Sequence, residues 1–195
     1  MVTLFIGGSK SGKSGLAERF AVSRPCARRL YIATLQPGGD PENLDRIRKH
    51  RVSREGCAFE TVEIYSPDRL DRFGDSLESC ARTVILLDCL GVMLSQGMFV
   101  RNADGRWIEI EGGQVERETM RALRKLAGKV ADLIIVVPDV FKEPVSDETT
   151  ERYRRLLGHT IQSIVRELDA AVIEAVAGVP IVWRDPTGDC GRWML

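Results

Sequence analysis

The octapeptide Gly7–Ser14 (GGSKSGKS) constrains the fold more than any other part of the sequence. It satisfies the pattern G-x-x-x-x-G-K-[ST] and lies between a β-branched apolar run, Val2–Ile6, and a segment of helical character, Lys13–Val22. A glycine-rich turn in this context directs backbone N–H groups at phosphate oxygens, and the helix adds its positive end. The pattern predicts a phosphate-binding loop made of Gly7, Gly8, Ser9, Lys10, Ser11, Gly12, Lys13 and Ser14.

Three side chains are expected to carry the chemistry of this loop. Lys13 would reach the β- and γ-phosphates of a nucleoside triphosphate, and the Ser14 hydroxyl would bind Mg²⁺. A second metal ligand is expected at the end of a neighbouring buried strand, and Asp88 directly follows the apolar run Thr83–Leu87. Capping of the next helix is an alternative role for Asp88. The loop alone does not distinguish kinase, ATPase and switch chemistry.

Apolar runs alternate with segments of helical periodicity along the whole chain. The expected strands are Val2–Ile6, Leu30–Thr34, Phe59–Val62, Thr83–Leu87 and Leu133–Val137, and the expected helices are Lys13–Val22, Pro41–Arg54, Gln114–Lys129 and Asp147–Leu168. Such alternation is typical of an α/β fold with a mostly parallel sheet and right-handed crossovers. We therefore expect a P-loop NTPase domain of the RecA-like type.

Two further segments complete the prediction. Ala171–Ala177 and Ile181–Trp183 flank a Gly-Val-Pro sequence at 178–180, which predicts a terminal antiparallel hairpin. Asn102–Gly113 is polar and glycine-rich, and we interpret it as an excursion between strands. No linker or internal repeat is visible, so residues 1–195 are expected to form a single nucleotide-binding domain.

Composition narrows the class of protein. The 28 Lys and Arg balance the 28 Asp and Glu, which argues against a globally basic nucleic-acid binder. The five cysteines form no C-x-x-C pair and are expected to be reduced thiols rather than disulfides or zinc ligands. No apolar run approaches the roughly 20 residues of a membrane helix, and no signal peptide is visible. We expect a cytoplasmic protein without membrane insertion.

A basic segment follows the second expected strand. Six of the positions from 46 to 54 are cationic or titratable, namely Arg46, Arg48, Lys49, His50, Arg51 and Arg54. On a helix, His50 would share a face with Arg46 and Arg54. A histidine flanked by guanidinium groups can act as a phosphate-directed nucleophile. A solvated basic face and a nucleic-acid patch, the latter weakened by the lack of aromatics, are the alternatives.

Several segments together resemble one family. The resemblance rests on GGSKSGKS, on LYIAT at 30–34, on the block Asp45–Arg51 followed by ETVE at 60–63, on LDCL at 87–90, and on Pro144–Arg155 and Ala177–Pro180. These segments resemble the bifunctional adenosylcobinamide kinase/adenosylcobinamide-phosphate guanylyltransferase family of cobalamin biosynthesis. The resemblance covers most of the chain.

The resemblance implies two successive reactions. The kinase phosphorylates adenosylcobinamide with ATP or GTP, and the transferase passes GMP from GTP to that phosphate through a guanylylated histidine, here His50, releasing pyrophosphate. It also implies Mg²⁺ and a homotrimer. The implied nucleotide contacts are the loop Gly7–Ser14 together with Thr34, Leu35, Gln36, Arg51, Val52, Ser53, Arg54, Glu63 and Asp88.

Two segments depart from the family pattern. The family carries Asn-Glu-Val-Gly after the fifth strand, whereas this chain reads PDVFKE at Pro138–Glu143. The segment Gln96–Gly113 also differs. These departures leave two alternatives open: a P-loop kinase of another small molecule, without a covalent intermediate, and a nucleotide-binding paralogue without catalysis.

Overall fold

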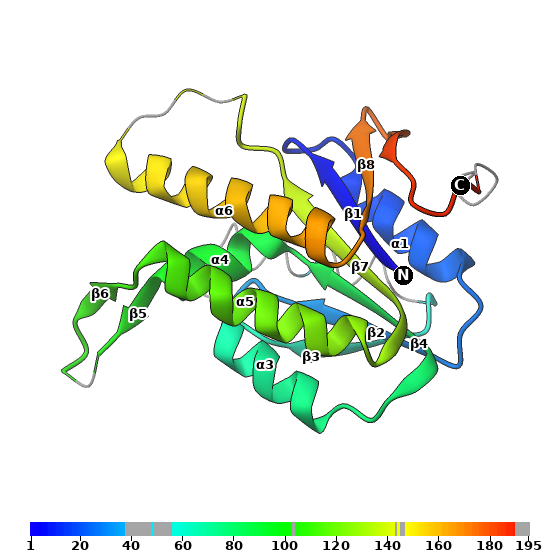
Figure 1. The fold of residues 1–195 in the computed structure, drawn as a ribbon, viewed down its shortest axis with the longest axis horizontal. Coiled ribbons are helices and arrows are strands. Elements are labelled where there is room, and N and C mark those ends of the chain that lie inside the picture. Colours follow the sequence, from blue (N-terminus) through cyan, green and yellow to red (C-terminus); the bar gives the residue numbers. More distant parts are fainter. Residues whose placement is uncertain (38–47, 49–55, 103, 143, 145–146, 190–195) are drawn as a thin grey trace.

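A seven-stranded sheet runs through the molecule in the order β3-β2-β4-β7-β1-β8-β9. Figure 1 shows the central strands of this sheet among the helices. The computed structural model describes residues 1–37, 48, 56–102, 104–142, 144 and 147–189. Neighbouring strands are parallel except for the antiparallel pair β8–β9. The strands are β1 (Val2–Gly7), β2 (Arg28–Ala33), β3 (Phe59–Glu63), β4 (Cys80–Asp88), β7 (Val130–Pro138), β8 (Ala171–Val176) and β9 (Val179–Arg184). The predicted α/β fold with a mostly parallel sheet and a terminal hairpin is confirmed.

Helices cover both faces of this sheet. The helix α1 packs on one face, and α3, α4, α5 and α6 pack on the other. Their bounds are Lys13–Ser23 (α1), Pro67–Ser76 (α3), Leu90–Met98 (α4), Gly112–Ala127 (α5) and Glu148–Glu167 (α6). Of the expected helix 41–54, only Arg48 belongs to the described residues, and it is helical. No helix among the described residues is long and apolar enough to cross a membrane.

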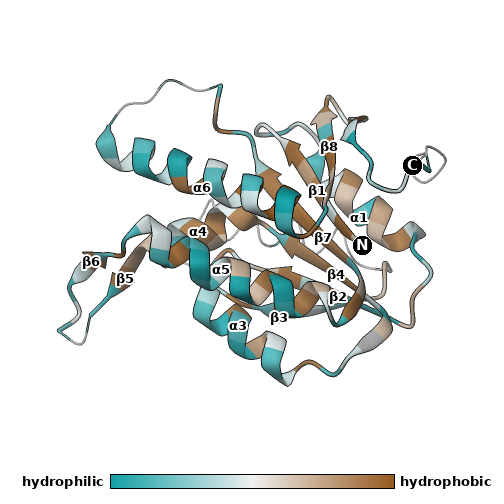
Figure 2. Cartoon of the chain, in the orientation of Figure 1, coloured by the Kyte–Doolittle hydropathy of each residue, from teal (hydrophilic) through white to brown (hydrophobic). Residues whose placement is uncertain are grey.

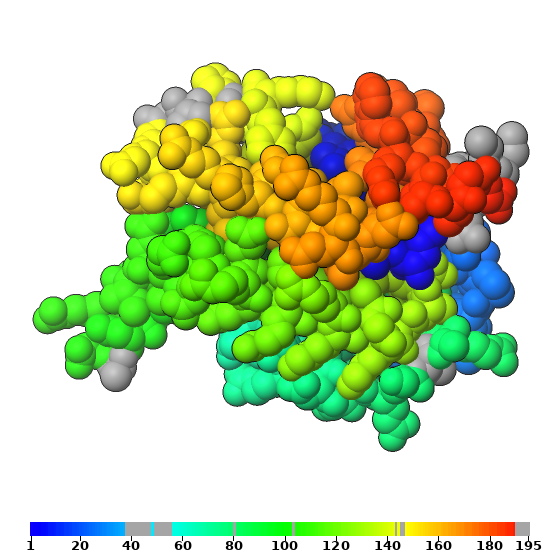
Figure 3. Space-filling view, viewed as in Figure 1, coloured from blue at the N-terminus to red at the C-terminus, as the bar shows by residue number. Residues whose placement is uncertain are grey.

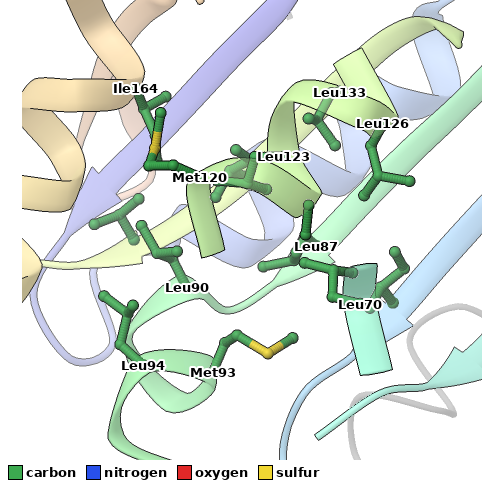
Figure 4. Packing of buried hydrophobic residues seen from close by; sticks show 14 of the residues in the cluster. Leu70, Leu87, Leu90, Met93, Leu94, Met120, Leu123, Leu126, Leu133 and Ile164 are labelled. Atoms are coloured by element: carbon green, nitrogen blue, oxygen red, sulfur yellow. The ribbon is translucent and has the colours of Figure 1, made fainter. Parts of the chain in front are cut away.

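Burial on both faces explains the continuous apolar strands. Along β1, Leu4 packs with the α3–α6 layer while Phe5 packs with α1. The colouring in Figure 2 accordingly shows apolar central strands between helices whose outer faces are polar. Figure 4 shows the larger core, where Leu87 and Leu133 of the sheet lie among Leu123 and Met120 of α5 and Met93 of α4. The larger of the two cores lies on the side of the sheet that carries four helices, and the smaller lies beneath α1.

Several elements differ from the sequence prediction. Helix α4 was not predicted because it is buried on nearly every side, so its sequence (LGVMLSQGM) lacks amphipathic periodicity. Helix α3 is short and rich in charge, and it was also missed. The excursion at 102–113 contains the second strand of a protruding hairpin, β5 (Phe99–Arg101) with β6 (Trp107–Glu109) (Figure 1). Helix α5 already begins within it, at Gly112.

The turn of the terminal hairpin begins one residue earlier than predicted. Val176 pairs with Val179, and Pro180 is already opposite Ala175 in the ladder. The turn is therefore Ala177–Gly178, and both residues have positive φ (50° and 82°). A two-residue turn with positive φ at both positions matches the right-handed twist of the strands. Proline is tolerated in β9 because β9 is an edge strand.

Candidate active site

The predicted phosphate-binding loop connects β1 to α1. Gly7 ends the strand, and Lys13 begins the helix. The loop is closed by a hydrogen bond from the Ser11 N–H to the Gly8 carbonyl (3.3 Å) and leads into the first helical bond, from the Leu16 N–H to the Gly12 carbonyl (2.9 Å). The N-terminal end of a helix of this length carries free N–H groups and a positive dipole, which suit an anion.

Two glycines allow the loop to approach its neighbours closely. Gly12 has φ of 89°, and a Cβ there would lie 3.0 Å from the Gly178 Cα. A Cβ on Gly7 would lie 2.4 Å from the Ser11 Oγ. The Gly178 N–H donates to the Ser11 carbonyl at 2.9 Å, so the turn of the β8–β9 hairpin supports the loop from one side. Side chains at Gly7 or Gly12 would prevent this arrangement.

The polar side chains of the loop suit a phosphate ligand. The Lys13 Nζ donates to the Gly8 carbonyl at 3.1 Å, a weak local bond that a phosphate oxygen can replace. The Ser11 Oγ is buried without a hydrogen-bond partner among the described residues. A buried unsatisfied hydroxyl is costly, and a ligand oxygen would satisfy it. Ser14 is half-buried in the first turn of α1.

Asp88 ends β4, as the sequence predicted. The Tyr31 hydroxyl donates to the Asp88 Oδ2 at 2.8 Å and orients the carboxylate. The capping alternative receives no support, because Cys89 rather than Asp88 is the N-cap of α4, and no capping hydrogen bond from the Cys89 side chain is seen among the described residues. One strand, β7, separates β4 from β1. Ser14 and Asp88 supply hard oxygen ligands of the kind that Mg²⁺ prefers, so the residues fit such an ion.

Thr34 connects the ends of β2 and β4. Its N–H donates to the Asp88 carbonyl at 3.1 Å, and its hydroxyl accepts from the Cys89 N–H at 2.7 Å and donates to the Cys89 carbonyl at 3.0 Å. Gln96 donates to the Thr34 carbonyl. Thr34 is fully buried. Its hydrogen bonds to Asp88 and Cys89 hold the ends of the two strands together. Leu35 is half-buried, and Gln36 is exposed at the same edge.

Glu63 is not brought to the phosphate loop. It ends β3, opposite Ala33 of β2, and three strands separate β3 from β1. At about 4.8 Å per strand, the two strands lie roughly 19 Å apart. Glu63 instead borders a cavity of about 370 Å³ with Arg69 and Arg72 of α3.

Asp139 is a candidate site residue that the sequence reasoning missed. It follows β7, and its N–H donates to the Gly7 carbonyl at 2.9 Å. Its carboxylate accepts from the Phe141 N–H at 3.1 Å and pairs with Lys142 at 3.1 Å. The hydrogen bond from Lys142 to Asp139, with a second to Glu174, raises the pKa of Lys142. The available signal is an Asp that directly follows an apolar strand, which is the same signal that predicts Asp88.

The basic block lies outside the described residues. His50, Arg51, Val52, Ser53 and Arg54 therefore remain predictions from the sequence, and only Arg48 of that block is described, as an exposed helical residue. Within the described residues, the structure brings together Gly7–Ser14, Thr34, Asp88 and Asp139 at the carboxyl edge of the parallel strands. Ligands of open α/β sheets bind at this edge.

Comparison with solved structures supports the fold. The chain is similar to a prototypical ATPase from the type III secretion system of pathogenic bacteria, with a TM-score of 0.54 and 12% identity. The similarity covers 93% of this chain and 56% of that one, so the chain spans about half the length of the ATPase. At this identity the likeness concerns the fold alone.

Sequence comparison is more specific. The chain is 33% identical over 183 residues to the bifunctional adenosylcobalamin biosynthesis protein CobP of Pseudomonas aeruginosa, covering 93% of this chain and 96% of that protein. The family model described as cobinamide kinase / cobinamide phosphate guanyltransferase matches residues 3–182. That range contains the phosphate loop, Asp88, Asp139 and most of the terminal hairpin. The chain belongs to the cobinamide kinase / cobinamide phosphate guanyltransferase family.

Proposed function

We propose that this protein phosphorylates adenosylcobinamide with a nucleoside triphosphate and then transfers GMP from GTP to adenosylcobinamide phosphate. The observation that carries the proposal is the phosphate loop Gly7–Ser14, supported by the β8–β9 turn, in a chain that matches the family over residues 3–182. The family relationship supplies the substrates, and the loop supplies a site for their phosphates.

Both reactions need the same phosphate site. Backbone N–H groups of the loop and the Lys13 ammonium would bind the phosphates of the donor and neutralise their charge. Ser14 and Asp88 would hold Mg²⁺, which when bound neutralises charge on the β- and γ-phosphates. Fixing the donor in line with the acceptor hydroxyl accounts for much of the rate in reactions of this kind.

The second reaction is proposed to run through His50. A neutral imidazole nitrogen attacks the α-phosphorus of GTP, a P–N bond forms, and the bond to the leaving pyrophosphate breaks. A phosphate oxygen of adenosylcobinamide phosphate then attacks the same phosphorus, and the P–N bond breaks to release the histidine. The clustering of His50 with Arg46, Arg51 and Arg54 in the sequence supports this role.

The remaining assignments follow the family. We propose that nucleotide binding involves Thr34, Leu35, Gln36, Glu63 and the segment 51–54. Thr34 would contribute by holding the ends of β2 and β4 together through its hydrogen bonds to Asp88 and Cys89. We also propose that residues 1–195 form a single domain, that the enzyme is a cytoplasmic homotrimer, and that it needs neither nucleic acid nor a membrane.

The decisive experiment is incubation with GTP labelled at the α-phosphate, followed by denaturing electrophoresis. The wild-type protein is expected to retain label that is lost in acid and stable in alkali, as a phosphoramidate is. His50→Ala should lose the adduct and GMP transfer but keep cobinamide phosphorylation. His159→Ala is the matched control, since His159 is the other of the two histidines and lies on α6. Phosphorylation by a wild-type protein that never forms the adduct would favour a P-loop kinase without the second activity.

A further inference from the structure

The β8–β9 hairpin carries a concentration of exposed apolar side chains. Val176, Val179, Ile181 and Trp183 are all exposed, and so is Phe141 on the loop after β7. We call these five residues the hairpin patch. Soluble proteins rarely leave large contiguous apolar surface exposed unless it binds something.

The four hairpin residues share one face of the sheet. Val176 is directly opposite Val179, and Glu174 is opposite Ile181, so these side chains project to the same side. The Trp183 indole N–H donates to the Glu174 Oε2 at 2.9 Å, which places Trp183 on that side as well. Val172, two residues before Glu174, packs with the core under α3–α6. The hairpin patch therefore lies on the same face as α6.

Phe141 adjoins this face from the other side of the phosphate loop. Its ring lies against α6, where a Cβ on Gly158 would be 3.5 Å from the ring. The Arg154 guanidinium donates to its carbonyl at 2.7 Å. The next residue, Lys142, donates to the Glu174 Oε1 at 3.1 Å. The Trp183 indole N–H donates to the other oxygen of the same carboxylate, Oε2. These contacts hold the aromatic side chains in place before any ligand arrives.

The hairpin patch is continuous with the phosphate loop. Gly178, between Val176 and Val179, donates to the Ser11 carbonyl, and Asp139, two residues before Phe141, donates to the Gly7 carbonyl. In Figure 3, blue atoms of the N-terminal segment show between the yellow-green loop after β7 and the orange-red hairpin. A molecule bound on the patch would therefore lie beside the phosphates of the donor.

We propose that the hairpin patch binds the macrocycle of the acceptor, an inference that rests on the proposed function. A cobinamide is a broad, largely apolar ring edged by amide groups, and its reacting hydroxyl is on a short arm. That arm must reach the phosphate loop, so the ring must lie beside it. Exposed Trp183, Ile181 and Phe141 offer flat apolar surface, while Lys142 and Glu174 offer partners for amides.

The test compares two exposed tryptophans. Trp183 is 69% exposed on the hairpin patch, and Trp107 is 64% exposed on the distant β5–β6 hairpin. Cobinamide binding is measured by calorimetry, which needs no turnover. Trp183→Ala should raise the Kd for cobinamide about tenfold, because part of a large aromatic contact is lost. Trp107→Ala should not change it, and neither variant should change the Kd for ATP. Trp183→Phe keeps the apolar ring and should retain most of the affinity.

Three other results of the binding experiment would each lead to a different conclusion. Equal cobinamide affinity in the wild type and in folded Trp183→Ala overturns the inference and leaves the proposed function standing. Unchanged affinity together with dissociation of an oligomer, measured by analytical ultracentrifugation, would show that a second copy of the chain covers the patch. A wild-type protein that does not bind cobinamide would overturn the proposed function itself, before any variant is examined.

Discussion

The hydroxyl of Tyr31 donates a hydrogen bond to the Oδ2 of Asp88 at 2.8 Å. The two residues come from neighbouring strands, β2 and β4, in a register that pairs Ala33 with Asp88. Tyr31 is buried in the core beneath α1, so its ring cannot move far. The bond therefore fixes the direction of the carboxylate that we assign to the metal.

Changes at Tyr31 and Asp88 should affect activity in a graded way. Asp88→Asn should lower kcat by about 10²-fold or more, since it removes the charged metal ligand. Tyr31→Phe keeps the ring and should cost about tenfold or less, because one hydrogen bond to a charged group is lost. In Tyr31→Phe the Mg²⁺ concentration for half-maximal activity should rise. Activity as a function of Mg²⁺ concentration is the measurement, and an unaltered profile in Asp88→Asn would remove Asp88 from the metal site.

Lys13→Ala should abolish both reactions without unfolding the protein. Among the described residues, the Lys13 ammonium donates to one loop carbonyl, at 3.1 Å, and it is the loop side chain best placed to neutralise phosphate charge. We expect both rates to fall by about 10²–10³-fold, as for loss of one strong transition-state donor. Kinase and transferase assays are compared with thermal unfolding. Wild-type rates in Lys13→Ala would refute the phosphate assignment.

Gly12→Ala should destabilise the protein more than Gly8→Ala. Gly12 has φ of 89°, and its added Cβ would lie 3.0 Å from the Gly178 backbone, whereas a Cβ on Gly8 would meet no described residue within 4 Å. The positive φ alone costs about 1–2 kcal/mol for alanine, and the contact adds to it. Gly8→Ala should change the free energy of unfolding by less than about 1 kcal/mol. Urea unfolding measures both, and equal effects would contradict the described turn contact.

The Asp71 carboxylate should make stability depend on pH. Asp71 is nearly buried and pairs with Arg121 at 3.0 Å and Lys125 at 2.8 Å. Burial by itself would raise its pKa, but hydrogen bonds from Lys125 and Arg121 outweigh it and hold the pKa below the usual 3.8. A lowered pKa in the folded state stabilises the protein above the unfolded pKa, and this contribution is lost as the pH falls through the folded value.

The variant Asp71→Asn isolates this contribution. At pH 7 it should lower the free energy of unfolding by about 1–2 kcal/mol, because charge-assisted hydrogen bonds to a nearly buried carboxylate are lost while both cations stay partly exposed to water. The difference from wild type should shrink as the pH falls from 3.8 towards the lower pKa of the folded state, because the Asp71 carboxylate is protonated first in the unfolded chain and then in the folded protein. Asp75→Asn is the matched control, since Asp75 pairs with the same Lys125 but is 64% exposed. It should cost less than about 1 kcal/mol. A pH-independent difference for Asp71→Asn would contradict the assignment.

The elements that the sequence predicted correctly have local signatures. Strands β1, β4 and β7 are apolar runs buried on both faces, and α1, α5 and α6 were each predicted within two residues at either end. Helix α4 was missed because burial on nearly all sides removes its periodicity. The hairpin turn was misplaced because Gly178 was grouped with Pro180, although the positive φ at Ala177 places the turn one residue earlier.

The sequence by itself determined the phosphate loop, the α/β class and the candidate carboxylate Asp88, because each depends on residues adjacent in the chain. Only the tertiary structure decided that β7 lies between β1 and β4, and that Asp139 therefore meets Gly7. It likewise decided that Tyr31 orients Asp88 and that the β8–β9 turn supports Ser11. These relationships join residues more than 50 positions apart. They depend on which strands pair, and that choice is made by packing of the whole sheet rather than by any local pattern.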